Sequence, residues 1–226
     1  MSFKILYVTA TSHEAETLKK LKGFKQVRDK FFSGNLELEL LIGGVGAMST
    51  AWLMTRWISG NSKPHLALNA GIAGSYKQDY PVGTVVMPVS DCFADAGIED
   101  GERFLTLHES GLVKPDEYPF KNGFIHSENK YTDLFKKHLP HVKAITVNTA
   151  SGNENTIKRL QGKFDPDIET MEGAAFFYIC AKEKIPFFAL RAISNRVERR
   201  DRKKWNIPLA LENLSSELEM ILKTLE

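Results

Sequence analysis

Runs of apolar, often β-branched residues alternate along the chain with segments whose apolar residues recur every three to four positions. The apolar runs at residues 3–10, 82–93, 142–151 and 186–194 predict strands, because a strand covered on both faces of a sheet is apolar at nearly every position. The run at 65–75 predicts a strand that leads into a glycine-rich loop. The periodic segments predict helices at 11–23, 47–58, 129–139, 170–184 and from Pro208 onward. This alternation predicts an α/β fold: a central, largely parallel, twisted sheet flanked by helices.

Two segments depart from the alternation. Residues 24–44 alternate around a Ser-Gly-Asn turn at 33–35, which predicts an antiparallel hairpin whose second strand ends at Gly43 and Gly44, and which makes the sheet mixed. Residues 97–129 hold several Gly and Pro and few β-branched runs, and we expect a long excursion there. We find no internal repeat or linker, so we expect one domain over residues 1–226.

The composition excludes several classes of protein. A content of 42% hydrophobic and 26% charged residues, with a formal net charge of +2, is ordinary for a soluble protein and gives no sign of a nucleic-acid partner. No apolar run approaches the ~20 residues of a membrane helix and the N-terminus does not resemble a signal peptide, so we expect a cytoplasmic protein with no membrane partner. Cys92 and Cys180 lack a CxxC spacing and the histidines form no metal-spaced pair, which predicts buried free thiols and no metal site.

The strand ends select the candidate site, since ligands of such sheets bind beyond the carboxyl ends of the strands. They point to residues 9–14, 43–48, 69–75, 151–155 and Asn195. The glycine-rich segments GGVG (43–46) and AGIAG (70–74) match neither GxGxxG nor the Walker pattern, and each taken alone is more typical of a tight turn than of a phosphate loop. Glu14 suits the positive end of a helix dipole, whereas Glu172 opens an apolar helix, where a carboxylate tends to have a partner or a task.

Five motifs, in the order in which they occur along the chain, indicate a ligand site where each motif alone does not. VTATSHEAE, GGVGAMSTA, NAGIAGS, TMEGAA and RAISN resemble the nucleoside phosphorylase and nucleosidase superfamily, closest to the nucleosidases that cleave methylthioadenosine and S-adenosylhomocysteine. The similarity runs through nearly the whole chain. Within the superfamily, FADAGIEDGERF and NRVERRDRKKWNIPLALENL look most like the futalosine hydrolases of the alternative menaquinone pathway. The resemblance implies a purine nucleoside substrate, no cofactor, and a homodimer or higher homo-oligomer.

The resemblance also implies roles for individual residues. Glu172 and Met171 match the "ME" pair of the family, in which the carboxylate accepts hydrogen bonds from ribose hydroxyls and the thioether packs against the sugar. Glu14 matches the carboxylate that orients and deprotonates the attacking water. Ala73 and Gly74 match a loop that approaches the nucleoside closely, where a larger side chain would obstruct contact.

The choice of nucleophile separates a hydrolase from a phosphorylase. A phosphorylase needs a phosphate pocket, normally with arginine side chains, and neither glycine-rich segment contains arginine. Glu14 would repel the anion, so hydrolysis is favoured. A methylthioadenosine/S-adenosylhomocysteine nucleosidase, a phosphate-dependent 6-oxopurine nucleoside phosphorylase and a non-catalytic nucleoside-binding module stay as alternatives.

The end of the last predicted strand bears on the substrate. In the adenine-cleaving nucleosidases the position matched by Asn195 is an aspartate. An asparagine amide can donate to a carbonyl at C6 and accept from N7–H, which suits hypoxanthine, the base of futalosine; the alternative is a turn residue that ends a strand. Futalosine also carries a benzoate tail, and Arg196, Arg199 or Arg200 could bind its carboxylate, unless this charged segment is a solvated turn.

Overall fold

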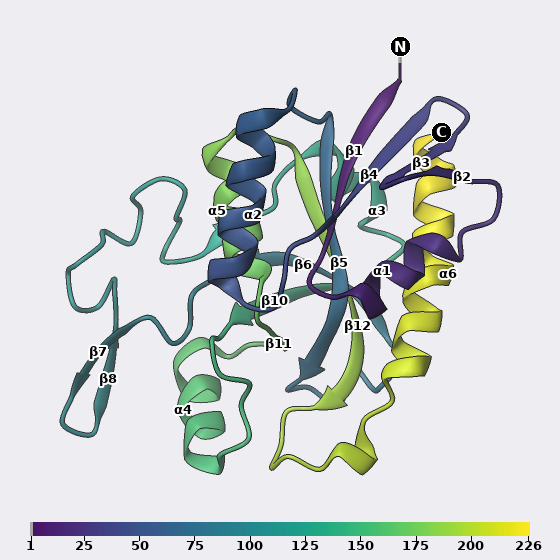
Figure 1. Ribbon diagram of the computed structural model, residues 1–226. Helices are drawn as coiled ribbons and strands as arrows, with labels where there is room; N and C mark the ends of the chain where they lie inside the picture. Colours follow the sequence, from purple (N-terminus) through teal and green to yellow (C-terminus); the bar gives the residue numbers. More distant parts are fainter. Residues whose placement is uncertain (1) are drawn as a thin grey trace.

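The computed structural model describes residues 2–226 and is built around one mixed β-sheet (Figure 1). In spatial order its strands are β11 (Ile168–Thr170), β10 (His141–Thr146), β6 (Val85–Asp91), β12 (Phe187–Arg196), β5 (Leu66–Ser75), β1 (Phe3–Thr9), β4 (Leu36–Ile42), β3 (Lys30–Ser33) and β2 (Lys25–Val27). Strand β9 (Ile125–His126) pairs with β6, and β7 (Gly97–Asp100) with β8 (Arg103–Thr106) forms a separate hairpin. β1 is parallel to β4 and β5, while β12 is antiparallel to β6. The predicted α/β class with a mixed sheet is confirmed.

Helices cover both faces of the sheet. They are α1 (Ser12–Lys19), α2 (Ala47–Gly60), α3 (Lys130–Phe135), α4 (Glu154–Phe164), α5 (Gly173–Lys182) and α6 (Ile207–Leu225), with a short 3₁₀ turn η1 (Arg202–Lys204) before α6. α1 and α6 lie together on one face and α2 and α5 on the other (Figure 1). No helix within residues 2–226 is long and apolar enough to cross a membrane.

Strand β1 shows why the sheet sequences are apolar at successive positions. Ile5 and Tyr7 are buried in the cluster that includes side chains of α1, α3 and α6, whereas Leu6 and Val8 are buried against side chains of α2 and α5. Successive side chains of a strand point to opposite faces, and here both faces are covered. The run FKILYVT therefore has only two partly exposed residues, at its start.

The sheet also curls back on itself. β5, β12, β6, β10 and β11 pair in succession, and β11 returns to β5 through the antiparallel pairs Ile168–Ser75 and Glu169–Gly74. The interior of this closed unit is filled by small and branched side chains such as Ala73, Val86 and Ile193. As a result, the segments that follow β10 and β11 lie beside the carboxyl end of β5.

The structure differs from the sequence prediction in several places, and strands β7, β8, β9 and β11 were not predicted. Residues 25–42 form a three-stranded meander of β2, β3 and β4, and the first helix ends at Lys19 before Gly23. The AGIAG segment is part of strand β5 instead of a loop, because β12 pairs along it on one side and β11 on the other. Helix α4 was missed: it is polar at most positions and buries only Leu160 and Phe164. The prediction of free, buried thiols at Cys92 and Cys180 is confirmed.

Candidate active site

A cavity of about 220 Å³ opens where the segments that follow β10 and β11 lie beside the carboxyl end of β5. It is lined by Ala10, Thr11, Glu14, Val45, Ile72, Ala73, Gly74, Ala150, Ser151, Glu169, Thr170, Met171, Glu172, Ser194, Asn195, Val197 and Trp205. Of the residues proposed from the sequence, Glu14, Ala73, Gly74, Met171, Glu172 and Asn195 are thus brought to one place. Ala73 and Gly74 reach it from strand β5 instead of the expected loop.

Glu14 is fixed by the start of helix α1. It is the third residue after the N-cap Thr11, and the two form a capping box. Its Oε2 accepts from the backbone N–H groups of Ala10 (3.2 Å) and Thr11 (2.9 Å) and from the Thr11 hydroxyl (2.9 Å). Its Oε1 accepts from the N–H of Ile72 at 3.0 Å. A carboxylate oxygen has about two acceptor positions, so Oε1 keeps one for a water or ligand hydroxyl.

Gly71 makes room for this carboxylate. A Cβ at residue 71 would lie 2.5 Å from the Glu14 Oε1, which is closer than a Cβ atom approaches an atom it is not bonded to. The glycine-rich composition of β5 therefore serves the close approach of Glu14 to the strand, instead of a phosphate loop.

Glu172 is the N-cap residue of helix α5 and accepts a hydrogen bond from the other glycine-rich segment, residues 43–46. Its Oε1 accepts from the N–H of Gly46 at 2.9 Å, and Gly46 has a φ of 94°, a conformation that favours glycine. Burial raises the pKa of Glu172; the bond from Gly46 and the charge of Arg191 act in the opposite direction. The two segments that the sequence left as turns or loops thus each contact one of the two predicted acidic residues.

Arg191 does not line the cavity, but its buried charge acts on the carboxylates of the site, and sequence reasoning missed it. It is 1% exposed on β12, and its guanidinium donates to the carbonyls of Asn69 (3.0 Å) and Leu190 (2.9 Å) and to the side-chain oxygen of Asn69. Burial lowers its pKa, while Glu172, Glu14, Asp91 and Tyr7 raise it. A sequence feature that could have indicated this buried charge is the arginine inside the apolar run FFALRAIS, because a buried arginine needs nearby negative charge.

Asn195 follows a β-bulge, where the register of β12 against β5 shifts between Ile193 and Asn195. Its Nδ2 donates to the carbonyl of Arg196 at 2.8 Å, and its Oδ1 accepts from the Ser194 hydroxyl at 2.7 Å. A Cβ on Gly74 would lie 3.2 Å from this Nδ2, so the glycine lies directly against the amide. One N–H and one acceptor position of the amide are left for a ligand in the cavity.

A third carboxylate fixes the segment that follows β10. Glu169 is 7% exposed on β11 and accepts from the Tyr76 hydroxyl at 2.7 Å. It also accepts from the N–H of Ser151 at 2.8 Å and from the Ser151 hydroxyl at 2.5 Å. Ser151 lines the cavity, so this cluster ties one wall of the cavity to strands β5 and β11. The pairing of β11 with β5, which creates the cluster, has no signature in the sequence.

The three arginines after Asn195 do not line the cavity. Arg196 donates both guanidinium nitrogens to the backbone carbonyls of Tyr76 and Lys77. Arg199 lies in a shallow groove with Glu198 and Lys204. Arg200 lies 5.6 Å from the ring of Trp205, which does line the cavity. Of the three, Arg200 is the one whose guanidinium lies over an aromatic ring of the cavity wall.

The phosphorylase superfamily model matches residues 4–225, and the chain therefore belongs to that superfamily. The resemblance drawn from the five motifs is confirmed.

Relatives of two kinds share the whole fold. The chain is 26% identical over 98% of both proteins to a 5'-methylthioadenosine/S-adenosylhomocysteine nucleosidase of Buchnera aphidicola subsp. Acyrthosiphon pisum (strain Tuc7). It is 28% identical to the futalosine hydrolase of Streptomyces coelicolor, over 83% of this chain and 80% of that protein. Among solved structures, futalosine hydrolase of Helicobacter pylori strain 26695 superposes with a TM-score of 0.77 at 17% identity, over 98% of this chain and 97% of the other. These relatives are nucleosidases and hydrolases, which supports the prediction of an N-glycosyl hydrolase.

Proposed function

We propose that the chain hydrolyses the N-glycosidic bond of futalosine and releases hypoxanthine, as a cytoplasmic enzyme of menaquinone biosynthesis. Such a reaction passes through a ribosyl cation, and the enzyme must hold the sugar, deliver water and accept the departing base. Glu172 and Met171 hold the ribose. Glu14 orients and deprotonates the water at its free Oε1 acceptor position, and Asn195 binds the purine.

The single observation that carries the choice of base is the amide of Asn195. Its remaining N–H can donate to the C6 carbonyl of hypoxanthine, and its remaining acceptor position can accept a hydrogen bond from N7–H of the leaving base. Adenine would need the amide flipped, with Oδ1 facing the C6 amino group, and the bond from Nδ2 to the Arg196 carbonyl opposes that flip. This favours the 6-oxopurine.

Water is favoured as the nucleophile because Glu14, Glu169 and Glu172 all line the cavity. Their carboxylates disfavour a phosphate ion. Cleavage of methylthioadenosine is the second candidate function, since relatives of both kinds align over most of the chain. One assay separates the candidates. The protein is incubated with futalosine, inosine, adenosine and methylthioadenosine, with and without phosphate, and the released base and sugar are identified.

We expect hypoxanthine from futalosine at a rate that does not depend on phosphate. A phosphate requirement, or faster release of adenine from methylthioadenosine than of hypoxanthine from futalosine, would contradict the proposal. Asn195→Asp provides a second test: it should lower kcat/KM for futalosine relative to methylthioadenosine by about tenfold or more, the usual penalty for a mismatched polar contact.

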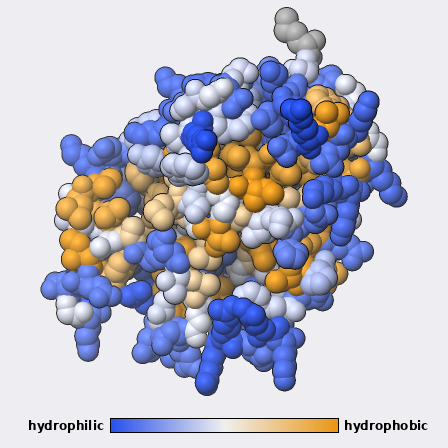
Figure 2. Space-filling view, in the orientation of Figure 1, coloured by the Kyte–Doolittle hydropathy of each residue, from blue (hydrophilic) through white to orange (hydrophobic). Residues whose placement is uncertain are grey.

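The proposal also covers the residue that binds the substrate tail and the oligomeric state. Among the three arginines, we assign the tail carboxylate to Arg200, because its neighbour Trp205 lines the cavity. Arg200→Met should lower kcat/KM for futalosine about tenfold and leave inosine cleavage unchanged. We further propose a homo-oligomer, because Met48 (83% exposed) and Trp52 (58%) project from α2, close in sequence to the cavity residue Val45. Figure 2 shows several hydrophobic patches on one face of the molecule.

A further inference from the structure

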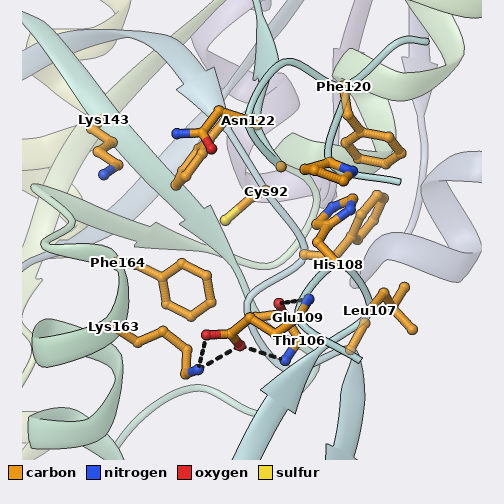
Figure 3. A pocket seen from close by; sticks show the side chains of 15 residues that line it. Cys92, Thr106, Leu107, His108, Glu109, Phe120, Asn122, Lys143, Lys163 and Phe164 are labelled. Atoms are coloured by element: carbon orange, nitrogen blue, oxygen red, sulfur yellow. Dashed lines mark hydrogen bonds and ion pairs between the residues drawn. The ribbon is translucent and has the colours of Figure 1, made fainter. Parts of the chain in front are cut away.

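A second cavity, of about 450 Å³, lies apart from the candidate active site and shares no lining residue with it (Figure 3). Its walls come from the segment after β6, the excursion between β8 and β9, strand β10 and the end of α4. The lining includes the rings of Phe120, Phe124 and Phe164 and the charged side chains of Lys143, Lys163 and Glu109. A volume of this size is in the range of sites for small organic ligands.

Aromatic rings form much of the wall. Phe124 and Phe164 meet edge to face at 6.4 Å between centroids, and His108 meets Phe120 in the same way at 4.9 Å. The thiol of Cys92 adds an apolar surface, since burial raises its pKa well above the usual value. Because the rings are held by one another, the cavity offers preformed, flat apolar surfaces to a ligand.

The two lysines of the cavity differ in their partners. Lys163 donates to both oxygens of Glu109, at 2.7 and 2.6 Å, and Glu109 also accepts from the N–H of Thr106 at 2.8 Å, as the dashed lines in Figure 3 mark. The ammonium of Lys143 lies 4.5 Å from the centre of the Phe124 ring. Within residues 2–226 it has no acidic partner at ion-pair distance. Lys143 is therefore the lysine of the cavity whose ammonium makes no direct ion pair within this range, although its charge also helps to lower the pKa of Asp165.

The charge distribution restricts the ligand to a single negative charge. Phe164 is the last residue of α4, so the carbonyl end of this helix, with its partial negative charge, lies at the cavity. Together with Glu109 it disfavours a phosphate or another multiply charged anion. We propose that this cavity is a binding site for a small aromatic monocarboxylate. The ring packs among the phenylalanines, and the carboxylate pairs with Lys143 and accepts from the amide of Asn122.

The test measures binding of para-fluorobenzoate to the purified protein by fluorine NMR, with the uncharged para-fluorobenzamide as the matched probe. Lys143→Met should weaken benzoate binding about tenfold or more, the value of a charge-assisted hydrogen bond, and leave benzamide binding unchanged. Lys143→Arg should restore it. The control is Lys130→Met, because the Lys130 ammonium also lies over a ring, that of Tyr131 at 4.9 Å, but outside the cavity.

Equal benzoate affinity of the Lys143→Met variant and the parent protein would overturn the proposal, as would an equal loss in the Lys130→Met variant. Displacement of benzoate by hypoxanthine would assign the binding to the other cavity and would also overturn it. Phe164→Ala supplies an independent check, since it removes a wall without changing charge and should weaken both probes alike.

Discussion

Replacing Glu172 with glutamine tests the candidate site at its most informative position. The side chain keeps its shape, and the amide oxygen can still accept from the N–H of Gly46, a bond of 2.9 Å in the structure. The glycine-rich segment 43–46 therefore stays in place. The second oxygen becomes an NH₂ group, so a ribose hydroxyl that donated to the carboxylate now meets a donor.

The expected loss follows from the charge of the acceptor. A hydrogen bond to a charged group contributes about 1.5–3 kcal/mol, which corresponds to a fall of roughly 10- to 150-fold in kcat/KM. The free energy of unfolding of the variant should rise or stay the same. Burial is the largest influence on the pKa of Glu172 and raises it, so removing the charge relieves a desolvation cost.

Two measurements on the Glu172→Gln variant test the role of Glu172. Steady-state release of hypoxanthine from futalosine gives kcat/KM, and urea unfolding gives the free energy of unfolding. The matched control is Glu154→Gln, because Glu154 is also a carboxylate at the start of a helix but lies outside the cavity. The control should leave both quantities unchanged. Activity of the Glu172→Gln variant within about threefold of the parent would refute the assignment, and so would a loss of activity matched by a loss of stability.

Three further substitutions probe neighbouring groups. Gly71→Ala should lower kcat/KM at least about tenfold in the hydrolysis assay, since the new Cβ would lie 2.5 Å from the Glu14 Oε1 and displace that carboxylate. Parent-like activity would refute the role of Glu14. Tyr76→Phe removes the 2.7 Å bond to Glu169 and should lower the free energy of unfolding in urea by about 1–3 kcal/mol. Burial raises the pKa of Asp91 from 3.8 to about 7 in the folded state, so its stabilising contribution is complete below pH 4 and is lost as the pH rises to 7. Relative to Asp91→Asn, the parent should lose on the order of 4 kcal/mol of unfolding free energy over this interval, and parallel pH profiles would contradict the burial argument.

Local sequence patterns predict only some of the contacts that position the carboxylates of Glu14 and Glu172. Glu14 follows Thr11 at the capping-box spacing, so its place at a helix start was readable from the sequence. Its contact with Ile72 was not, because that bond joins residues 58 positions apart. The same holds for the bond between Glu172 and Gly46, which are 126 positions apart.

The sequence by itself determined the order and type of most strands and helices, the mixed sheet, and the family through its five motifs. It did so because burial on both faces leaves continuous apolar runs, and because helix starts carry local capping signals. Only the tertiary structure decided that AGIAG is a strand, that β11 closes the sheet onto β5, and that Arg191 is buried near Glu14 and Glu172. These features depend on pairing and electrostatic contacts between distant segments, and no local pattern in the chain encodes which distant segment will be the partner.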